Sequence, residues 1–510
     1  MFIKILLLVI FFAVTAGVGL YCRKHATDVS SFVLGGRSVG PWLTAFAYGT
    51  SYFSAVVFVG YAGQFGWRFG ISATWIGLGN AIIGSLLAWM IFGRRTRVMT
   101  QHLGSATMPD FFGARYDSKG LKLAASAIIF IFLIPYTASL YNGLSRLFAM
   151  AFGVDFWVCI VIMAALTGIY VIAGGYVATA VNDFIQGLIM IVGIIAVVAA
   201  VLNTNGGLMA SLDAMKLVQD TAGGAAPGVF ASILGPDPLN LVGVILLTSL
   251  GTWGLPQMVQ KFYAIKSEKS IAKGAIISTI FATIIAGGAY FLGGFGRLFS
   301  NVIETRPDGS VIYDSIIPGM LSGFPDLLIG VVIVLVLAAS MSTLSALVMT
   351  SASTLTLDFI KGAIVKTMDE KKKVLTIRLL IVVFVLISAA IAILQYNKNI
   401  VFIAQLMGVS WGALAGSFLA PFLYGLYWKR ATKAAAWCSM IFGTLFMTAN
   451  FLASAGVIPK EIFPAVLQSP INAGAFTMLF GLVLVPLVSL LGPKPKKAHV
   501  DDCFSCYDKA

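Results

Sequence analysis

The chain has 510 residues, of which 59% are hydrophobic and only 11% are charged, and its net charge is +14. A soluble domain carries about a quarter charged residues, so this composition excludes a soluble globular protein and indicates a chain dissolved in a lipid bilayer. An outer-membrane barrel would show alternating segments of about ten residues, and the apolar runs here do not alternate. The expected fold class is therefore all-α and polytopic.

A helix that crosses the hydrocarbon core needs about 20 apolar residues. The sequence predicts about thirteen such transmembrane helices, at 2–21, 40–66, 71–93, 123–150, 156–173, 183–203, 239–260, 274–298, 326–352, 376–395, 400–426, 434–456 and 472–492. Residues 1–22 also have the basic residue, apolar stretch and small residues of a cleaved signal. We favour retention of this segment as the first span, because its apolar run is full length.

Most of the 34 Lys and Arg residues lie in loops that follow odd-numbered spans, as at 94–97, 371–373 and 429–433. Cytoplasmic loops carry an excess of Lys and Arg. This bias predicts a multi-pass protein of the cell membrane with its N-terminus outside and its C-terminus in the cytoplasm. The basic excess is therefore a topology signal, and no nucleic-acid partner is expected.

No soluble catalytic domain is visible. The longest polar stretches, 204–238 and 299–325, contain no nucleophile, phosphate-binding or metal-ligating constellation, so the protein is not expected to be an enzyme. All three histidines lie outside the spans, and Asp183 is the one acidic residue within the register of an apolar run, which argues against a proton relay. Cys503 and Cys506 form a C-x-x-C pair in the tail, but a zinc site needs four ligands, and no transition metal is expected.

Two spans have breaks at matching positions. The span 40–66 contains Gly49, Thr50, Ser51 and Ser54, and the span 239–260 contains a Gly-Thr-Trp-Gly-Leu-Pro run at 251–256. Gly and Pro weaken helices, and unwound helices expose carbonyls that hold Na⁺ in transporters. The two breaks are five spans apart, which suggests two inverted five-helix repeats. Simple kinks are the alternative, because Gly and Pro are common in membrane helices.

A third segment, in the span 326–352, offers adjacent hydroxyls at Ser342 and Thr343, with Ala339 one turn earlier. These small residues could serve a cation site or close helix packing. The resulting organisation comprises a first helix and loop at 1–39 and a transporter core at 40–426, with repeats at about 40–203 and 239–426. Two peripheral helices at 427–492 and a cytoplasmic tail at 493–510 follow.

Four motifs in order resemble those of the sodium:solute symporter family. They are Phe32-Val-Leu-Gly-Gly-Arg-Ser-Val-Gly-Pro41, Tyr170-Val-Ile-Ala-Gly-Gly-Tyr-Val-Ala178 leading to Asn182-Asp183, Gly254-Leu-Pro-Gln257, and Ala338-Ala-Ser-Met-Ser-Thr-Leu-Ser345. The resemblance spans about residues 28–430. It implies the five-plus-five inverted-repeat fold of broken-helix transporters.

By this resemblance, Na⁺ is expected at the carbonyls of Thr50, Phe53 and Ala339 and the hydroxyls of Ser342 and Thr343. Asp183 matches a family carboxylate implicated in sodium binding or exit, and Arg37 matches an arginine near the inner gate. A helix cap or a gate ion pair is an equal alternative for Asp183. Na⁺ is the expected coupling ion, and no other cofactor is expected.

The branches of the family differ in substrate. Tyr136 matches an aromatic of the proline branch, whereas Gly254-Leu-Pro256 and Asn182-Asp183 look more like the pantothenate and monocarboxylate branches. Candidate substrate-lining residues are Tyr52, Ser54, Tyr136, Thr252, Trp253 and Gln257, each of which could equally serve packing. The resemblance implies Na⁺-coupled import of an amino acid, monocarboxylate or pantothenate-like acid by alternating access. The alternative is a symporter-like nutrient sensor that acts through a separate partner. A lipid-embedded monomer is expected, and an oligomer is compatible with the sequence.

Overall fold

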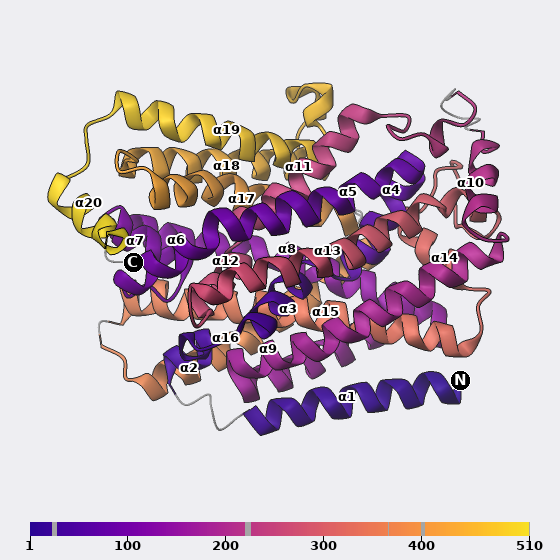
Figure 1. Cartoon of the computed structure of the whole chain (residues 1–510), viewed down its shortest axis with the longest axis horizontal. Helices are drawn as coiled ribbons and strands as arrows, with labels where there is room; N and C mark the ends of the chain where they lie inside the picture. The colour runs from indigo at the N-terminus through magenta and orange to yellow at the C-terminus, as the bar shows by residue number, and fades with distance from the viewer. Residues whose placement is uncertain (23–27, 220–225, 366, 399–402, 509–510) are drawn as a thin grey trace.

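The computed structural model describes residues 1–22, 28–219, 226–365, 367–398 and 403–508. Over this part of the chain the regular structure is helical, apart from two isolated β-bridges. Most long helices run roughly parallel to the long axis of the molecule (Figure 1). Their number and apolar character agree with the all-α membrane fold that the composition predicts.

The first half of the chain contains α1 (Phe2–Cys22), α2 (Val29–Leu34), α3 (Pro41–Tyr52), α4 (Ala62–Phe69), α5 (Thr74–Gly79), α6 (Ala88–His102), α7 (Met108–Arg115), α8 (Lys119–Phe152), α9 (Phe156–Thr204) and α10 (Leu208–Lys216). The second half contains α11 (Pro238–Gly254), α12 (Pro256–Ala264), α13 (Lys269–Gly294), α14 (Ile316–Leu321), α15 (Asp326–Thr354), α16 (Glu370–Lys398), α17 (Ile403–Tyr427), α18 (Lys433–Ser454), α19 (Pro470–Leu491) and α20 (Lys497–Phe504). Wider π-helical segments are η3 (Val56–Tyr61), η5 (Asn80–Leu87) and η9 (Leu355–Ile364).

Among the described residues, ten helices are long and apolar enough to cross a membrane, or eleven if the bent pair α11 and α12 is one span. The sequence predicted about thirteen. The difference has three sources: the helical stretch Val56–His102 covers parts of two predicted spans, the apolar helix Trp157–Ile169 is too short to be counted, and the predicted span 239–260 is the bent pair. Gly70 and Gly175 have positive φ, +64° and +58°, and each interrupts a helical stretch at a boundary between two predicted spans. The short apolar helix Trp157–Ile169 lies before the second break.

The helices at the two edges of the molecule pack onto one central group. Helix α1 packs on α9 and α15, and its N-terminal amine and Lys4 both form ion pairs with Asp326. At the other edge, α18 and α19 pack on α17 and on each other (Figure 1). Helices α3, α8, α11, α13 and α15 lie between these edges, so the two predicted breaks are in the interior.

Both predicted breaks are present. Helix α3 ends at Tyr52, where Phe53 has an extended conformation (φ −86°, ψ 120°), and the chain resumes in η3. Helix α11 ends at Gly254, Leu255 is also extended (φ −78°, ψ 122°), and α12 begins at Pro256 with a bend of 46°. Proline disfavours the helical conformation of the residue before it, so the second break follows directly from Pro256.

The C-terminal segment folds back onto the end of the molecule that carries α7 (Figure 1). Lys429 pairs with Asp501 at 2.8 Å, and the Arg95 guanidinium lies 4.5 Å from the centre of the Tyr507 ring. Burial raises the pKa of the Cys503 and Cys506 thiols above the usual range. In the part of the chain that the structure describes, no group of three His, Cys, Asp or Glu side chains is placed to hold a metal ion.

Candidate ion and substrate site

The hydroxyls of α15 meet the break in α3. Thr343 Oγ1 lies 3.1 Å from the carbonyl oxygen of Thr50, 3.3 Å from that of Phe53 and 3.0 Å from that of Ala339. Ser342 Oγ donates to Thr50 Oγ1 at 2.7 Å. All five residues are buried. The structure therefore brings together every residue that the resemblance assigns to sodium.

The number of protons in this cluster does not match the number of acceptors. The Ala339 carbonyl lies within the continuous helix α15 and already accepts from the Thr343 N–H. The single proton of the Thr343 hydroxyl can donate to only one of the two carbonyls at the break, those of Thr50 and Phe53. The Thr50 hydroxyl already donates to the carbonyl of Phe46. Buried acceptors without a donor are costly, and a bare cation satisfies several of them at once. Neutral carbonyls and hydroxyls from an unwound helix are the ligands used for Na⁺ in broken-helix transporters.

A third hydroxyl of α15 completes the support of the break. The backbone N–H of Ala55, which a continuous helix would use, donates to Ser340 Oγ at 3.2 Å. Within a membrane every backbone polar group must find a partner inside the protein. The extended residues of α3 are thus held in place by side chains of α15 rather than by a proline.

Asp183, on α9, lies beside this cluster. Its carboxylate is buried, without a hydrogen-bond partner of normal geometry, and Ser342 and Lys261 are its polar neighbours. Lys261, on α12, is buried as well, with its ammonium 5.2 Å from the centre of the Tyr176 ring. No direct ion pair joins the two groups among the described residues, so each is a buried charge that feels the other at a distance. Asp183 lies at the sodium cluster, and Lys261 lies on the helix that follows the second break.

Arg37 occupies a separate position between three segments. It has a left-handed backbone conformation (φ +55°) and donates to the carbonyls of Ser105 (2.5 Å) and Tyr263 (3.3 Å) and to the Thr100 hydroxyl (3.3 Å). These contacts join the segment before α3 to the ends of α6 and α12. Arg37 therefore cross-links the ends of these helices through neutral groups.

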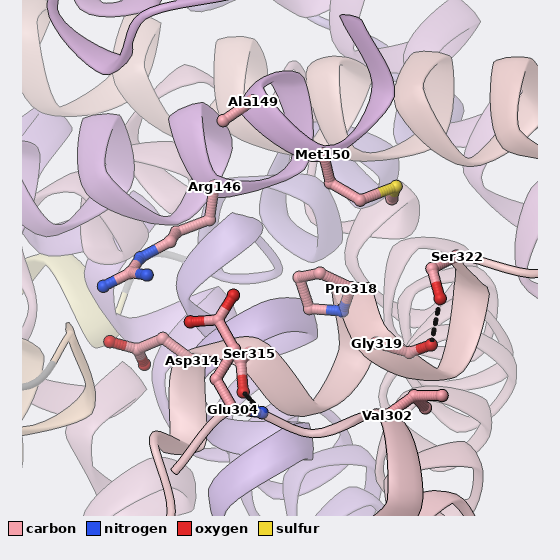
Figure 2. Close-up of a pocket in the computed structure, with 10 residues that line it drawn as sticks. All are labelled: Arg146, Ala149, Met150, Val302, Glu304, Asp314, Ser315, Pro318, Gly319 and Ser322. Carbon is pink, nitrogen blue, oxygen red and sulfur yellow. Dashed lines mark hydrogen bonds between the residues drawn. The ribbon is translucent and has the colours of Figure 1, made fainter. Parts of the chain in front are cut away.

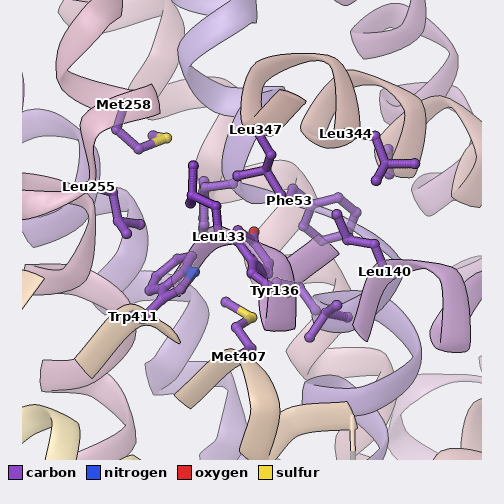
Figure 3. Close-up of a cluster of buried hydrophobic side chains, with 14 of the residues drawn as sticks. Phe53, Leu133, Tyr136, Leu140, Leu255, Met258, Leu344, Leu347, Met407 and Trp411 are labelled. Atoms are coloured by element: carbon purple, nitrogen blue, oxygen red, sulfur yellow. The ribbon is translucent and has the colours of Figure 1, made fainter. Parts of the chain in front are cut away.

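An aromatic cluster lies between the two breaks. Figure 3 shows Phe53, Tyr136, Leu255 and Trp411 around one centre. The Tyr136 and Trp411 rings meet edge to face at 5.9 Å, and Tyr52 lies 6.4 Å from Trp411. The hydroxyls of Tyr52 and Tyr136 are buried without a hydrogen-bond partner. Such an apolar centre with a few unused polar atoms is typical of a small-molecule site.

Other unused polar atoms belong to the same two breaks. The Ser54 hydroxyl and both amide atoms of Gln257 are buried without partners, and Ser54 lies beside the Tyr136 hydroxyl. Two of the predicted lining residues are instead used by the protein itself. The Thr252 hydroxyl lies 2.8 Å from the carbonyl oxygens of both Gly84 and Ser249 and can donate to one of them, and the Trp253 indole donates to the carbonyl of Ile83 at 2.9 Å. The structure thus groups Tyr52, Ser54 and Tyr136 around Trp411, it leaves Gln257 buried just after the second break, and it places Thr252 and Trp253 against η5.

Sequence reasoning missed two residues of this centre. The Trp411 indole nitrogen and the Asn80 amide nitrogen are buried and have no hydrogen-bond partner. Trp411 lies in an apolar, glycine-rich run of α17, where an aromatic residue carries no positional signal. The structure shows why α11 can approach this ring: Gly251 has no side chain, and a Cβ added there would lie 2.5 Å from Trp411.

A polar cavity of about 480 Å³ opens near the end of the molecule that carries α14. Figure 2 shows the Arg146 guanidinium from α8 facing the carboxylates of Glu304 and Asp314. Ser315 accepts a hydrogen bond from the Glu304 backbone N–H at 3.1 Å and so fixes this loop. The cavity therefore presents both signs of charge.

Two broken helices, an oxygen cluster between α3 and α15 and a buried aromatic centre define a membrane transporter of the inverted-repeat class. The model of the Sodium:solute symporter family matches residues 32–443, and the chain belongs to this family. It is therefore a Na⁺-coupled secondary transporter that imports a small solute, and it is not an enzyme.

Individual relatives agree with this assignment. The chain is 32% identical over 457 residues to a sodium/proline symporter of Staphylococcus aureus strain JH9, with 86% of this chain and 84% of the relative covered. Its structure is similar to that of a Na⁺-coupled sialic acid symporter in a substrate-bound outward-open state (TM-score 0.77, 18% identity, 98% and 99% coverage). It also resembles MHP1, a nucleobase-cation-symport-1 family transporter (TM-score 0.51, 15% identity, 92% and 97% coverage). At these identities the two structures support the fold alone.

Proposed function

We propose that this transporter binds Na⁺ between the break of α3 and the hydroxyls of α15, and that it imports a small amino acid or a related organic acid. The observation that carries the ion site is the position of Thr343 Oγ1, within 3.3 Å of the Thr50 and Phe53 carbonyl oxygens at the break, which its single proton cannot satisfy together. Asp183 supplies negative charge next to Ser342, and Arg37 acts at the inner gate.

The proposed substrate contacts are Tyr52, Ser54, Tyr136 and Gln257, with Trp411 as an apolar wall. The substrate carboxylate would meet backbone N–H groups at the broken helices, where the helix dipole favours an anion. The polar cavity near α14 carries one cationic side chain, Arg146, and two acidic ones, Glu304 and Asp314. Both signs of charge there favour a zwitterionic solute over a simple anion. Together with the name of the sodium/proline relative, these features make small amino acids, L-proline first, the leading class.

The direct test is uptake into proteoliposomes under an imposed Na⁺ gradient. L-Proline, other small amino acids, lactate and pantothenate would be supplied in turn, with K⁺ replacing Na⁺ as the control. We expect uptake of at least one amino acid that stops when Na⁺ is replaced. Uptake that persists without Na⁺ and collapses with a proton gradient would refute the coupling. Binding without flux would instead favour the sensor alternative, which no structural observation supports.

We also propose that the N-terminus and the loop 295–325 face the outside and that α20 faces the cytoplasm, as the distribution of Lys and Arg indicates. On a cysteine-free background, Asp308→Cys and Lys494→Cys would each carry one thiol. A membrane-impermeant thiol reagent should label Asp308→Cys in intact cells and Lys494→Cys only after permeabilisation. The reverse pattern would invert the topology.

A further inference from the structure

A second cavity, of about 300 Å³, lies at the end of the molecule that carries α20 and is separate from the transport site. It is bordered by the end of α7, the start of α18 and the segment between α19 and α20. Its lining includes Arg115, Lys433, Lys494 and Lys496, against one carboxylate, Asp117. The cavity is therefore strongly basic.

The charges of this cavity are incompletely neutralised. Lys496 lies 3.7 Å from Asp117, which compensates one of them. Arg115 is buried and donates to the backbone carbonyls of Gly425 (2.8 Å) and Trp428 (3.1 Å), which do not cancel its charge. Within the described ranges, no ion pair is formed by Lys433 or Lys494. An anion in the cavity would be attracted by three cationic side chains.

Backbone groups add to this attraction. Thr432 caps the 22-residue helix α18 by accepting a hydrogen bond from the N–H of Ala435. Lys433 and Ala434, the first two residues of the helix, line the cavity. The first N–H groups of a helix have no intrahelical acceptor, and the helix dipole favours negative charge there. The start of α18 therefore supports the same ligand chemistry as the lysines.

The surface next to the cavity is suited to hydrocarbon chains. The side chains of Leu445 on α18 and of Leu487 and Leu490 on α19 are exposed, and Leu491, at the end of α19, is 88% exposed. Leu491 is separated from the cavity residue Pro493 by one glycine. An anionic group with attached acyl chains could thus place its charge in the cavity and its chains along α18 and α19.

We propose that this cavity binds the phosphodiester headgroup of an anionic phospholipid of the cytoplasmic leaflet. Basic pockets at the cytoplasmic ends of membrane helices bind such headgroups. The choice of leaflet rests on the proposed orientation, whereas the binding itself requires neither Na⁺ nor the transported solute. Bound lipid would connect α7, the α18–α19 pair and the segment leading to α20.

The test measures thermal stabilisation of the purified full-length protein by phosphatidylglycerol in mixed micelles, with phosphatidylcholine as the uncharged reference. The double variant Lys433→Gln/Lys494→Gln removes the two lysines without an ion pair. Each charge near a lipid surface is worth about fivefold in affinity, so the double variant should need roughly thirtyfold more phosphatidylglycerol for half of the effect. The variant Lys433→Arg/Lys494→Arg should restore most of the response.

The matched control is Lys460→Gln. Lys460 is exposed in the turn between α18 and α19, at the opposite end of the same helix pair. This variant should respond to phosphatidylglycerol like the wild type. An equal loss in Lys460→Gln, or an unchanged response in the double variant, would overturn the proposal. Inorganic phosphate is tested last, at the same concentration as phosphatidylglycerol. Equal stabilisation by the two would overturn the lipid proposal and assign the cavity to a soluble anion.

Discussion

The two broken helices reach the same backbone conformation by different means. In the α11–α12 pair, Leu255 is extended because Pro256 follows it, so the break is built into the local sequence. After α3, Phe53 is extended without any proline; its carbonyl lies 3.3 Å from the Thr343 hydroxyl of α15, and the nearby Ala55 N–H donates to Ser340 of the same helix. One break is thus local and the other depends on tertiary contacts. A cation that binds the same oxygens can therefore bias the packing of α3 against α15.

The largest expected effect concerns Lys261, the buried cationic neighbour of the Asp183 carboxylate. Lys261→Met leaves the buried Asp183 carboxylate without its cationic neighbour, which should destabilise the protein by roughly 3 kcal/mol. The thermal midpoint in detergent measures this loss. Adding Asp183→Asn to Lys261→Met should recover most of the stability.

Lys216→Met is the surface control, because Lys216 pairs with Asp213 in an exposed position and such pairs contribute about 1 kcal/mol or less. If Lys261→Met is no less stable than Lys216→Met, Lys261 does not stabilise the buried Asp183 carboxylate.

The next effect tests the tertiary break. Ser342→Ala/Thr343→Ala removes both hydroxyls from the oxygen cluster. Bonds to a charged partner contribute about 1.5 kcal/mol or more each, so the Na⁺ concentration for half-maximal uptake should rise roughly a hundredfold. Ser353→Ala is the control, because the buried Ser353 hydroxyl bonds only within α15. Equal Na⁺ dependence of the two variants would remove these hydroxyls from the ion site.

The local break is tested at Gly251. A methyl group there would lie 2.5 Å from the Trp411 ring, and overpacking of this kind costs about 1–3 kcal/mol. Gly251→Ala should therefore raise KM for the solute about tenfold, with a smaller change in Na⁺ half-saturation. Gly287→Ala is the matched control, since its added methyl would meet no atom within 4 Å. If Gly251→Ala weakened only Na⁺ affinity and left KM for the solute unchanged, the assignment of the solute to the second break and of Na⁺ to the first would be contradicted.

The smallest effect concerns the support of the α3 break. Ser340→Ala deprives the Ala55 N–H of its acceptor, at a cost of about 1 kcal/mol. Na⁺ half-saturation should rise by about fivefold, because the carbonyls of Thr50 and Phe53 are held less firmly. At saturating Na⁺ the uptake rate of Ser340→Ala should equal that of the wild type. A lower rate would show that the substitution disrupts the site beyond its ion ligands.

The same contrast explains what could be predicted from sequence. The break at Pro256 has a local cause, so the residues 251–256 indicated it directly. The break at Phe53 was indicated by flexible and polar residues at 49–54, and its partners on α15 were assigned through family resemblance. Trp411 and Asn80 were missed because their roles depend on packing between distant helices. The predicted thirteen spans exceed the ten or eleven long apolar helices because Val56–His102 is one helical stretch across two predicted spans and Trp157–Ile169 is short.

The most direct test of the central claim is the stabilisation of the purified protein by Na⁺ in Thr343→Ser and Thr343→Ala, with K⁺ as the reference ion. Stabilisation by a ligand that binds only the folded state follows its concentration and affinity. Thr343→Ser keeps the hydroxyl between the carbonyls of Thr50, Phe53 and Ala339, so it should retain the Na⁺ response. Thr343→Ala should lose most of it. Equal Na⁺ responses in the two variants would contradict an ion site between the break of α3 and α15.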